Sequence, residues 1–186
     1  MTATGRVLVA GVGNIFLGDD GFGVEVARRL AFADLPGPVR VADYGTSGMH
    51  LAYDLADGYD STILIDAAPR GGQPGTLTVL EIAPEHRSDP TLAGGPLQGS
   101  RMFDAHGMQP DLVFGVLEML GAQAGRILVV GCEPASLAEG IGLSEPVAAA
   151  VGEAVDLVKS LVATELADGA ARPAPGTAPD QLNSAN

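Results

Sequence analysis

The sequence predicts an α/β protein with a doubly wound, mostly parallel sheet and helices on both of its faces. Short apolar runs rich in β-branched residues alternate along the chain with longer stretches whose apolar residues follow a helical spacing. Such alternation builds right-handed β-α-β units, in which helices cover the parallel strands. The five expected strands are Val7–Ala10, Val39–Tyr44, Ser61–Ala68, Gly75–Ile82 and Arg126–Gly131.

Four helices are expected between and after these strands. Apolar stripes mark the first (Val24, Val26, Ala27, Leu30), the second (Met49, Leu51, Ala52, Leu55, Ala56) and the third (Leu112, Val113, Val116, Leu117, Leu120). The third follows Pro110 and ends at Gly121. The last has Ser144 as its N-cap and Pro146 in its first turn, and its stripe continues to about Leu166.

The fourth strand is expected to run against the others. Its connection from the third strand, Pro69 to Pro74, is too short to hold a crossover helix, so we expect it to be antiparallel to its predecessor. Its even alternation of apolar and polar residues is typical of a strand near a sheet edge. The first three strands should have the order 2-1-3, with the crevice at the carboxyl ends of the first and third.

Length and composition indicate one domain, residues 1–167, followed by a tail, residues 168–186. The tail is rich in Ala, Pro, Gly, Ser and Asn, a composition that buries too little apolar surface to stay ordered. The 186-residue chain carries a formal charge of −13, which argues against nucleic acid or an anionic membrane as partner. Its single cysteine, Cys132, excludes an internal disulfide, and no signal peptide or membrane span is apparent, so we expect a cytoplasmic protein.

The first turn, from Gly11 to Gly23, connects the first strand to the first helix and holds two adjacent acids, Asp19 and Asp20. In a purely structural interpretation, one of them caps the helix that follows. That interpretation accounts for one aspartate and does not require the second. A dinucleotide fingerprint needs a third glycine where Phe16 stands, and the two carboxylates oppose a bound pyrophosphate. Nucleotide binding is therefore the weaker interpretation, although Asp43 after the next strand would suit a ribose.

Three side chains are predicted to meet at the switch point of the sheet. Asp20 follows the first strand, Asp66 ends the third, and His106 lies in the long Pro/Gly/Ser-rich loop from Pro84 to Gln109. Two carboxylates and an imidazole can bind a borderline divalent cation and leave coordination positions open. The alternative is that all three are structural: a cap, a strand end and a loop histidine.

Other catalytic arrangements are weaker. The sequence has no nucleophile-elbow, zincin or P-loop motif. Cys132 ends a buried strand, where an inert thiol is expected. Glu133 and Asp43 stand near carboxyl strand ends and are candidates for orienting the metal ligands.

Four stretches together resemble the hydrogenase maturation endopeptidases. They are Gly11-Val12-Gly13-Asn14 with Gly18–Gly23; Asp43–Leu51; Ile63–Ala67; and His106 with Val130–Pro134 and Gly142–Ser144. This family removes a C-terminal peptide from the large subunit of [NiFe] hydrogenases after nickel insertion. The resemblance implies a three-layer αβα fold, in which a twisted five-stranded sheet with one antiparallel strand lies between helices.

The resemblance also implies roles for particular residues. Asp20, Asp66 and His106 match the family's metal-binding triad, and Gly45, Thr46, Ser47 and Gly48 match its substrate-placing turn. We expect the nickel to be carried by the precursor rather than bound tightly by the protease. The alternative is a nickel-binding checkpoint or chaperone protein that uses the same three ligands without hydrolysis.

Overall fold

A computed structural model describes residues 5–82, 117, 119–122 and 124–171 of the chain. Its central feature is a five-stranded sheet. The strands are β1 (Val7–Val12), β2 (Val39–Gly45), β3 (Ser61–Ala67), β4 (Leu77–Ile82) and β5 (Arg126–Cys132). The helices are a 3-10 turn, η1 (Gly18–Gly21), and α1 (Phe22–Leu30), α2 (Gly48–Ala56) and α4 (Glu145–Ala171).

The strand order is β2-β1-β3-β5-β4, with every neighbouring pair parallel except β4 and β5. The 2-1-3 start, the single antiparallel strand and its edge position are confirmed. β4 runs against β3, as predicted, but its hydrogen-bonded partner is β5, which lies between them. The connection from Ala68 to Thr76 can span this gap because two strand spacings amount to only about 10 Å.

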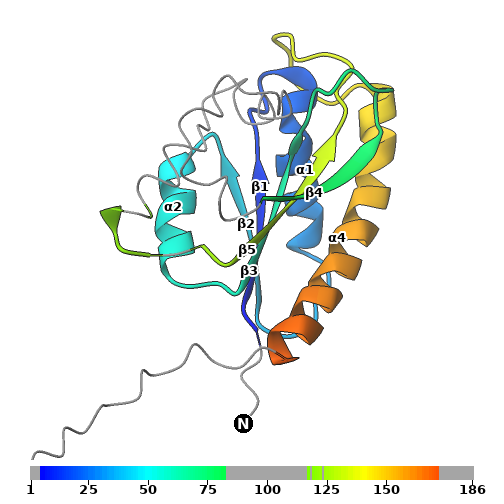
Figure 1. The fold of residues 1–186 in the computed structure, drawn as a ribbon. Coiled ribbons are helices and arrows are strands. Elements are labelled where there is room, and N and C mark those ends of the chain that lie inside the picture. Colours follow the sequence, from blue (N-terminus) through cyan, green and yellow to red (C-terminus); the bar gives the residue numbers. More distant parts are fainter. Residues whose placement is uncertain (1–4, 83–116, 118, 123, 172–186) are drawn as a thin grey trace, which may run out of the picture.

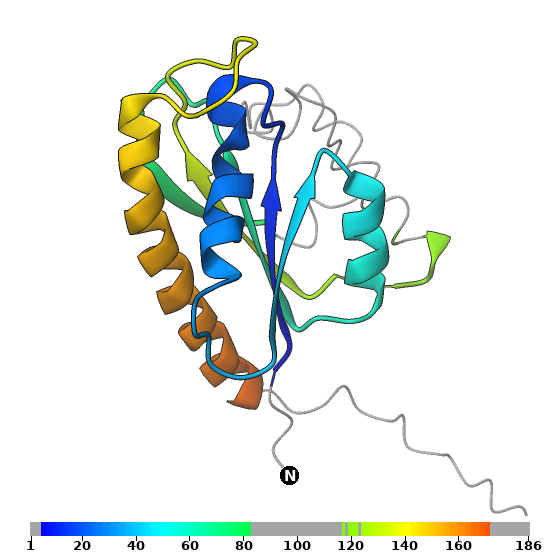
Figure 2. The same cartoon turned by 180° about the vertical axis from the view of Figure 1, so that it is seen from behind.

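Alternating side chains of the sheet build two separate cores, one on each face. Figures 1 and 2 show α1 and α4 on one face of the sheet and α2 on the other. Val7 and Val9 of β1 pack with α1 and α4, whereas Leu8 and Ala10 pack on the α2 side. β1 and β3 are buried throughout, as expected for strands covered on both faces. The three-layer αβα prediction is therefore confirmed.

The third expected helix falls almost entirely outside the described residues. Leu117 and Met119 are helical, and Leu117 is buried in the α2-side core. The amide of Ala122 donates to the carbonyl of Leu117 at 2.9 Å, and Gly121 has a φ of +65°. A glycine with positive φ is the usual end of a helix, so this end agrees with the prediction.

The last helix is longer than predicted. α4 continues past the expected boundary at residue 167 to Ala171, so residues 168–171 belong to the folded domain and not to a tail. Two contacts of its final turn favour this: Asp168 lies 3.9 Å from a guanidinium nitrogen of Arg126, and Gly169 packs closely on Gly5. The rest of the expected tail, residues 172–186, lies outside the described residues.

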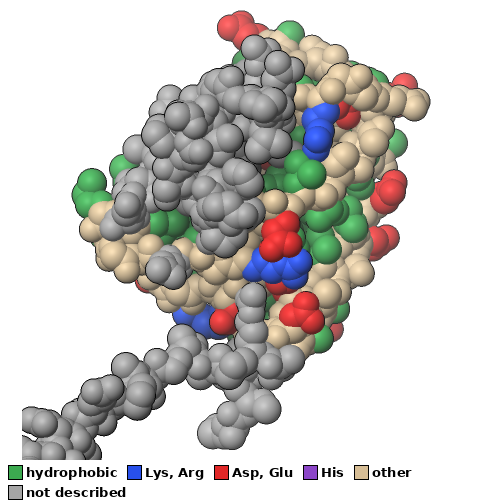
Figure 3. Space-filling model, viewed as in Figure 1, with side chains coloured by type: hydrophobic (Ala, Val, Ile, Leu, Met, Phe, Trp, Pro, Cys, Tyr) green, Lys and Arg blue, Asp and Glu red, His purple; other side chains and the backbone are tan. Residues whose placement is uncertain are grey.

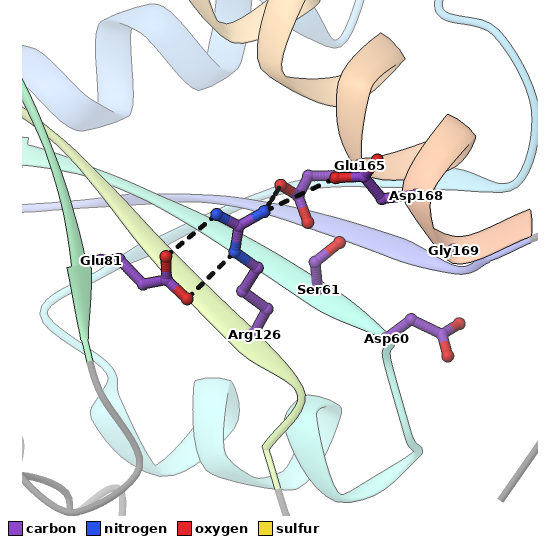
Figure 4. Close-up of a pocket in the computed structure, with 7 residues that line it drawn as sticks. All are labelled: Asp60, Ser61, Glu81, Arg126, Glu165, Asp168 and Gly169. Atoms are coloured by element: carbon purple, nitrogen blue, oxygen red, sulfur yellow. Dashed lines mark hydrogen bonds and ion pairs between the residues drawn. The ribbon is translucent and has the colours of Figure 1, made fainter. Parts of the chain in front are cut away.

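Arg126 joins β4, β5 and α4 at the amino ends of the parallel strands. Its guanidinium donates to both carboxylate oxygens of Glu81, at 3.0 and 2.9 Å, and to Glu165 at 2.7 Å (Figure 4). A hollow of about 430 Å³ lies here, lined by Asp60, Ser61, Glu81, Arg126, Glu165, Asp168 and Gly169. It is at the opposite end of the sheet from the predicted switch-point site.

One face of the molecule carries its charges in small groups. Acidic and basic side chains on the face shown in Figure 3 are scattered singly or in pairs, and its described part has no large basic patch. Among the helices of the described residues, none has the length and apolar character needed to cross a membrane.

Candidate active site at the carboxyl edge of the sheet

The first turn folds tightly against the start of the helix that follows it. Gly13 has a φ of +127°, and a Cβ there would lie 1.9 Å from the carbonyl oxygen of Asp20. A Cβ on Gly23 would lie 2.0 Å from the carbonyl oxygen of Ile65 in β3. Glycine at these positions lets the acid-bearing turn sit directly on the ends of β1 and β3.

Asp20 lies in η1 and is 5% exposed. Its carboxylate accepts a hydrogen bond from the backbone amide of Asn14 at 2.6 Å. The side-chain oxygen of Asn14 in turn accepts from the amide of Phe16 at 3.0 Å. The N-cap of α1 is Gly21, without a side-chain cap, so the interpretation of Asp20 as a helix cap is wrong.

Asp66 is the penultimate residue of β3 and is 6% exposed. One carboxylate oxygen accepts from the amide of Ala67 at 2.8 Å. Burial raises the pKa of Asp66 well above its usual value, and the nearby charge of Asp20 raises it further, while the Ala67 hydrogen bond lowers it. The structure thus brings the two predicted acids within electrostatic reach of each other at the switch point.

His106, the third predicted ligand, lies outside the described residues. Within the described ranges, no group of three His, Cys, Asp or Glu side chains could hold a metal ion. The acid pair by itself provides oxygen ligands, which suit divalent cations but leave the coordination incomplete. The three-residue ligand set therefore stays a prediction.

Asp19, the other acid of the turn, is a structural residue that sequence reasoning did not separate from Asp20. Its carboxylate accepts four hydrogen bonds from the segment after β5: the amides of Ala135 (2.8 Å), Ser136 (3.0 Å) and Ser144 (2.6 Å) and the Ser144 hydroxyl (2.9 Å). Burial alone raises the pKa of Asp19, but these hydrogen bonds outweigh it and the pKa is lowered. Asp19 anchors the β5–α4 loop over the first turn.

Ser144 stands at the N-cap position of α4, as predicted, and its carbonyl accepts from the amide of Ala148 at 2.8 Å. Its hydroxyl donates to Asp19. The start of α4 is thereby tied to the acid-bearing turn.

Glu133 holds a second loop at the same edge. Its two carboxylate oxygens accept from the backbone amides of Arg70 (2.8 Å) and Gly71 (3.1 Å), in the connection that follows β3. The carboxylate of Glu133 therefore binds backbone amides of this loop, and not a predicted metal ligand. Asp43 is exposed and accepts from the amide of Gly45 at 2.9 Å, while lying 3.6 Å from Arg28. The prediction that these two acids orient the ligands receives no support from their bonds.

The predicted substrate-placing turn lies beside the first turn. Gly45 ends β2 with a φ of +52°, and its carbonyl accepts from the amide of Gly13 at 2.9 Å. The amide of Ser47 donates to the carbonyl of Tyr44 at 2.8 Å, and α2 begins at Gly48. The segment from Gly45 to Gly48 therefore borders the crevice, and its role in substrate placement stays a prediction.

Cys132 is fully buried, and its thiol donates to the carbonyl of Glu133 at 3.8 Å. Burial raises the pKa of this thiol to about 12, and the charges of Asp19 and Glu133 contribute. A buried neutral thiol is a poor nucleophile, so the prediction that Cys132 is inert is supported.

Sequence comparison supplies the decisive observation. The chain is 32% identical over 155 residues to the hydrogenase 2 maturation protease of Escherichia coli K12, a match that covers 82% of this chain and 88% of that protein. It is 33% identical over 156 residues to the hydrogenase expression/formation protein HupD of Rhodobacter capsulatus, covering 81% and 70% of the two chains. The chain belongs to the hydrogenase maturation protease family.

Two further comparisons agree with this assignment. The family model described as "Hydrogenase maturation protease" matches residues 24–86 of this family member. The solved structure of the hydrogenase maturating endopeptidase HybD from E. coli superposes with a TM-score of 0.68 at 32% identity, covering 86% of this chain and 93% of that one. The resemblance noted in the sequence is confirmed, and so is its implied fold.

Proposed function

We propose that this protease removes the C-terminal peptide from the large-subunit precursor of a [NiFe] hydrogenase after nickel has been inserted, and that nickel is the element it recognises. The observation that carries the proposal is the meeting of Asp20 and Asp66, both buried, at the carboxyl edge of the sheet in a chain of this family. A [NiFe] hydrogenase maturation protease from Thermococcus kodakarensis shares the fold, with a TM-score of 0.61.

The chemistry of the acid pair suits contact with a cation brought by the substrate. Two carboxylates this close repel each other, and a divalent ion between them replaces repulsion by attraction. Asp20, Asp66 and His106 would contact nickel already seated in the precursor, so only a loaded precursor is aligned for cleavage. Nickel therefore enters as part of the substrate.

Hydrolysis needs the scissile carbonyl polarised or a water activated. The metal would supply a Lewis acid for either purpose, and a carboxylate of the pair would act as the base that takes a proton from the water. We assign no protein nucleophile, because the single cysteine is fully buried and its raised pKa keeps the thiol neutral. The turn from Gly45 to Gly48 places the precursor segment beside the pair. We infer that the protease acts in the cytoplasm, the compartment in which the large-subunit precursor would be assembled.

The test is to mix the purified protease with nickel-loaded and with nickel-free large-subunit precursor and to measure the precursor mass. We expect the loaded form alone to lose a C-terminal peptide. Cleavage of both forms would refute nickel recognition and leave the endopeptidase activity in place.

Binding of the loaded precursor without cleavage, across a panel of precursors from different hydrogenases, would favour the checkpoint alternative. A panel is needed because a protease of this kind can be specific for one hydrogenase. Absence of both binding and cleavage across the panel would refute the proposed function.

A further inference from the structure

Two large hydrophobic side chains are exposed on the loops that border the acid pair. Phe16, in the first turn, is 61% exposed, and Ile141, in the β5–α4 loop, is 82% exposed. Single exposed apolar residues are common and need no explanation. These two differ because hydrogen bonds join their loops to each other and to the candidate active site.

The backbone beneath the two side chains is fixed. The carbonyl of Phe16 accepts from the amide of Gly140, and the amide of Gly18 donates to the carbonyl of Gly140, both at 2.9 Å. These bonds form a short parallel bridge between Leu17 and Gly140, the neighbours of Phe16 and Ile141. The four hydrogen bonds to the Asp19 carboxylate hold the same two loops together.

Phe16 is also connected to the acid pair. Its amide donates to the side chain of Asn14, whose own amide donates to Asp20. Phe16 therefore lies only two hydrogen bonds from Asp20, and Ile141 lies on the loop tied to the same turn. Because hydrogen bonds already order these loops, binding a polypeptide segment to them costs little conformational entropy.

We propose that Phe16 and Ile141 are specificity-determining residues that contact apolar side chains of the precursor segment next to the scissile bond. This inference rests on the proposed function. A second copy of this chain is the less suitable occupant, because each copy carries a formal charge of −13 and the two would repel. The precursor segment is the occupant that the position beside Asp20 favours.

The test compares Phe16→Ala and Ile141→Ala with the wild type, using nickel-loaded precursor at several concentrations. Both side chains are exposed in the free protease, so the variants should fold, which thermal melts followed by circular dichroism would check. Each truncation removes apolar contact formed in the substrate complex, so KM should rise about tenfold while kcat stays within about twofold. Phe16→Leu, which keeps most of the apolar area, should recover most of the lost affinity.

Phe32→Ala is the matched control, because Phe32 is 94% exposed and follows α1 at the far end from the acid pair. It should leave KM unchanged. If Phe16→Ala and Ile141→Ala behave like Phe32→Ala, the docking inference is overturned while the proposed function stands. If the two variants change the mass of the protease alone in solution but not KM, the pair is a contact between copies and the inference is also overturned.

Failure of the proposed function has a different signature. Wild-type protease would then neither bind nor cleave any loaded precursor of the panel, and the docking inference would fall with it.

Discussion

Asp19 and Asp20 are adjacent, yet their carboxylates accept hydrogen bonds from different parts of the chain. Asp19 binds the β5–α4 loop through Ala135, Ser136 and Ser144, whereas Asp20 binds Asn14 within its own turn and interacts with Asp66. Asp19 is 1% exposed. One acid is therefore committed to structure, and the other remains at the crevice.

Replacing Asp19 by alanine should destabilise the fold strongly. The change leaves three backbone amides and a hydroxyl without their acceptor in a largely buried place, which should lower the free energy of unfolding by about 2–4 kcal/mol. Urea denaturation would measure this. The exposed Asp34→Ala should stay within about 0.5 kcal/mol of the wild type, and an Asp19→Ala loss as small as that would contradict the anchoring role.

Cys132 should resist thiol reagents in the folded protein. Burial raises its pKa to about 12, so the thiol is almost entirely protonated near pH 8, and the side chain is fully buried. A chromogenic disulfide reagent should modify Cys132 only after unfolding in guanidinium. Rapid modification of the folded protein would contradict this burial.

The raised pKa of Cys132 also predicts how the stability of the protein changes with pH. Its folded pKa lies above the usual value of 9.0, so folding favours the neutral form. The contribution is complete below about pH 9 and is lost as pH rises toward about 12. Denaturation midpoints of the wild type should fall across this range more steeply than those of Cys132→Ala.

β4, β5 and α4 are joined by Arg126, whose guanidinium donates hydrogen bonds to Glu81 and Glu165 and also lies near Asp168. Glu81 on the edge strand is exposed, whereas the side chain of Glu165 on α4 is 4% exposed. A buried carboxylate needs its cation far more than an exposed one does, because it has lost the solvation by water. The bond from Arg126 to Glu165 is therefore the one that matters for stability.

Arg126→Ala should lower the free energy of unfolding by about 3 kcal/mol, because it leaves the Glu165 carboxylate buried without its cation. Arg29→Ala is the control: it breaks an exposed helical pair with Glu25 at 3.1 Å and should cost less than about 0.5 kcal/mol. Thermal and urea denaturation would measure both. Equal losses in the two variants would show that Glu165 does not depend on Arg126.

The candidate active site is a product of the whole topology. Asp20 and Asp66 are far apart in sequence and meet because β1 and β3 are parallel neighbours, with β2 on the other side of β1. Parallel neighbours place their carboxyl ends at the same edge. The chain leaves β1 toward β2 and leaves β3 toward the opposite side of the sheet, so a crevice forms between the two connections. The loops tied by Asp19 and Glu133 surround this edge.

Asp20→Asn and His106→Ala should each reduce precursor processing at least about a hundredfold with the fold intact, because each removes a group proposed to contact the substrate's nickel. Asp34→Asn and His50→Ala, which change exposed residues of the same types, are the controls and should process normally. Precursor mass after a fixed time gives the extent of processing. Full processing by both site variants would refute the triad.

Local patterns were enough to predict most of the fold. The strands, the helices on both faces, the 2-1-3 order and the antiparallel edge strand follow from apolar periodicity and from the lengths of connections, because burial on one or two faces imposes those periods. The convergence of Asp20 and Asp66 followed from their positions after parallel strands. Each of these features depends on short-range sequence or on a general rule of chain topology.

Tertiary structure alone decided which partner each polar group has. The pairing of β4 with β5, the anchoring role of Asp19, the loop contacts of Glu133 and the extension of α4 to Ala171 depend on atoms distant in sequence. A carboxylate accepts hydrogen bonds from whichever donors the folded chain places within about 3 Å. The sequence around two adjacent aspartates does not show which donors each of them will meet. Sequence by itself determined where the acids stand along the chain, and packing decided that Asp19 binds the β5–α4 loop while Asp20 lies beside Asp66 at the crevice.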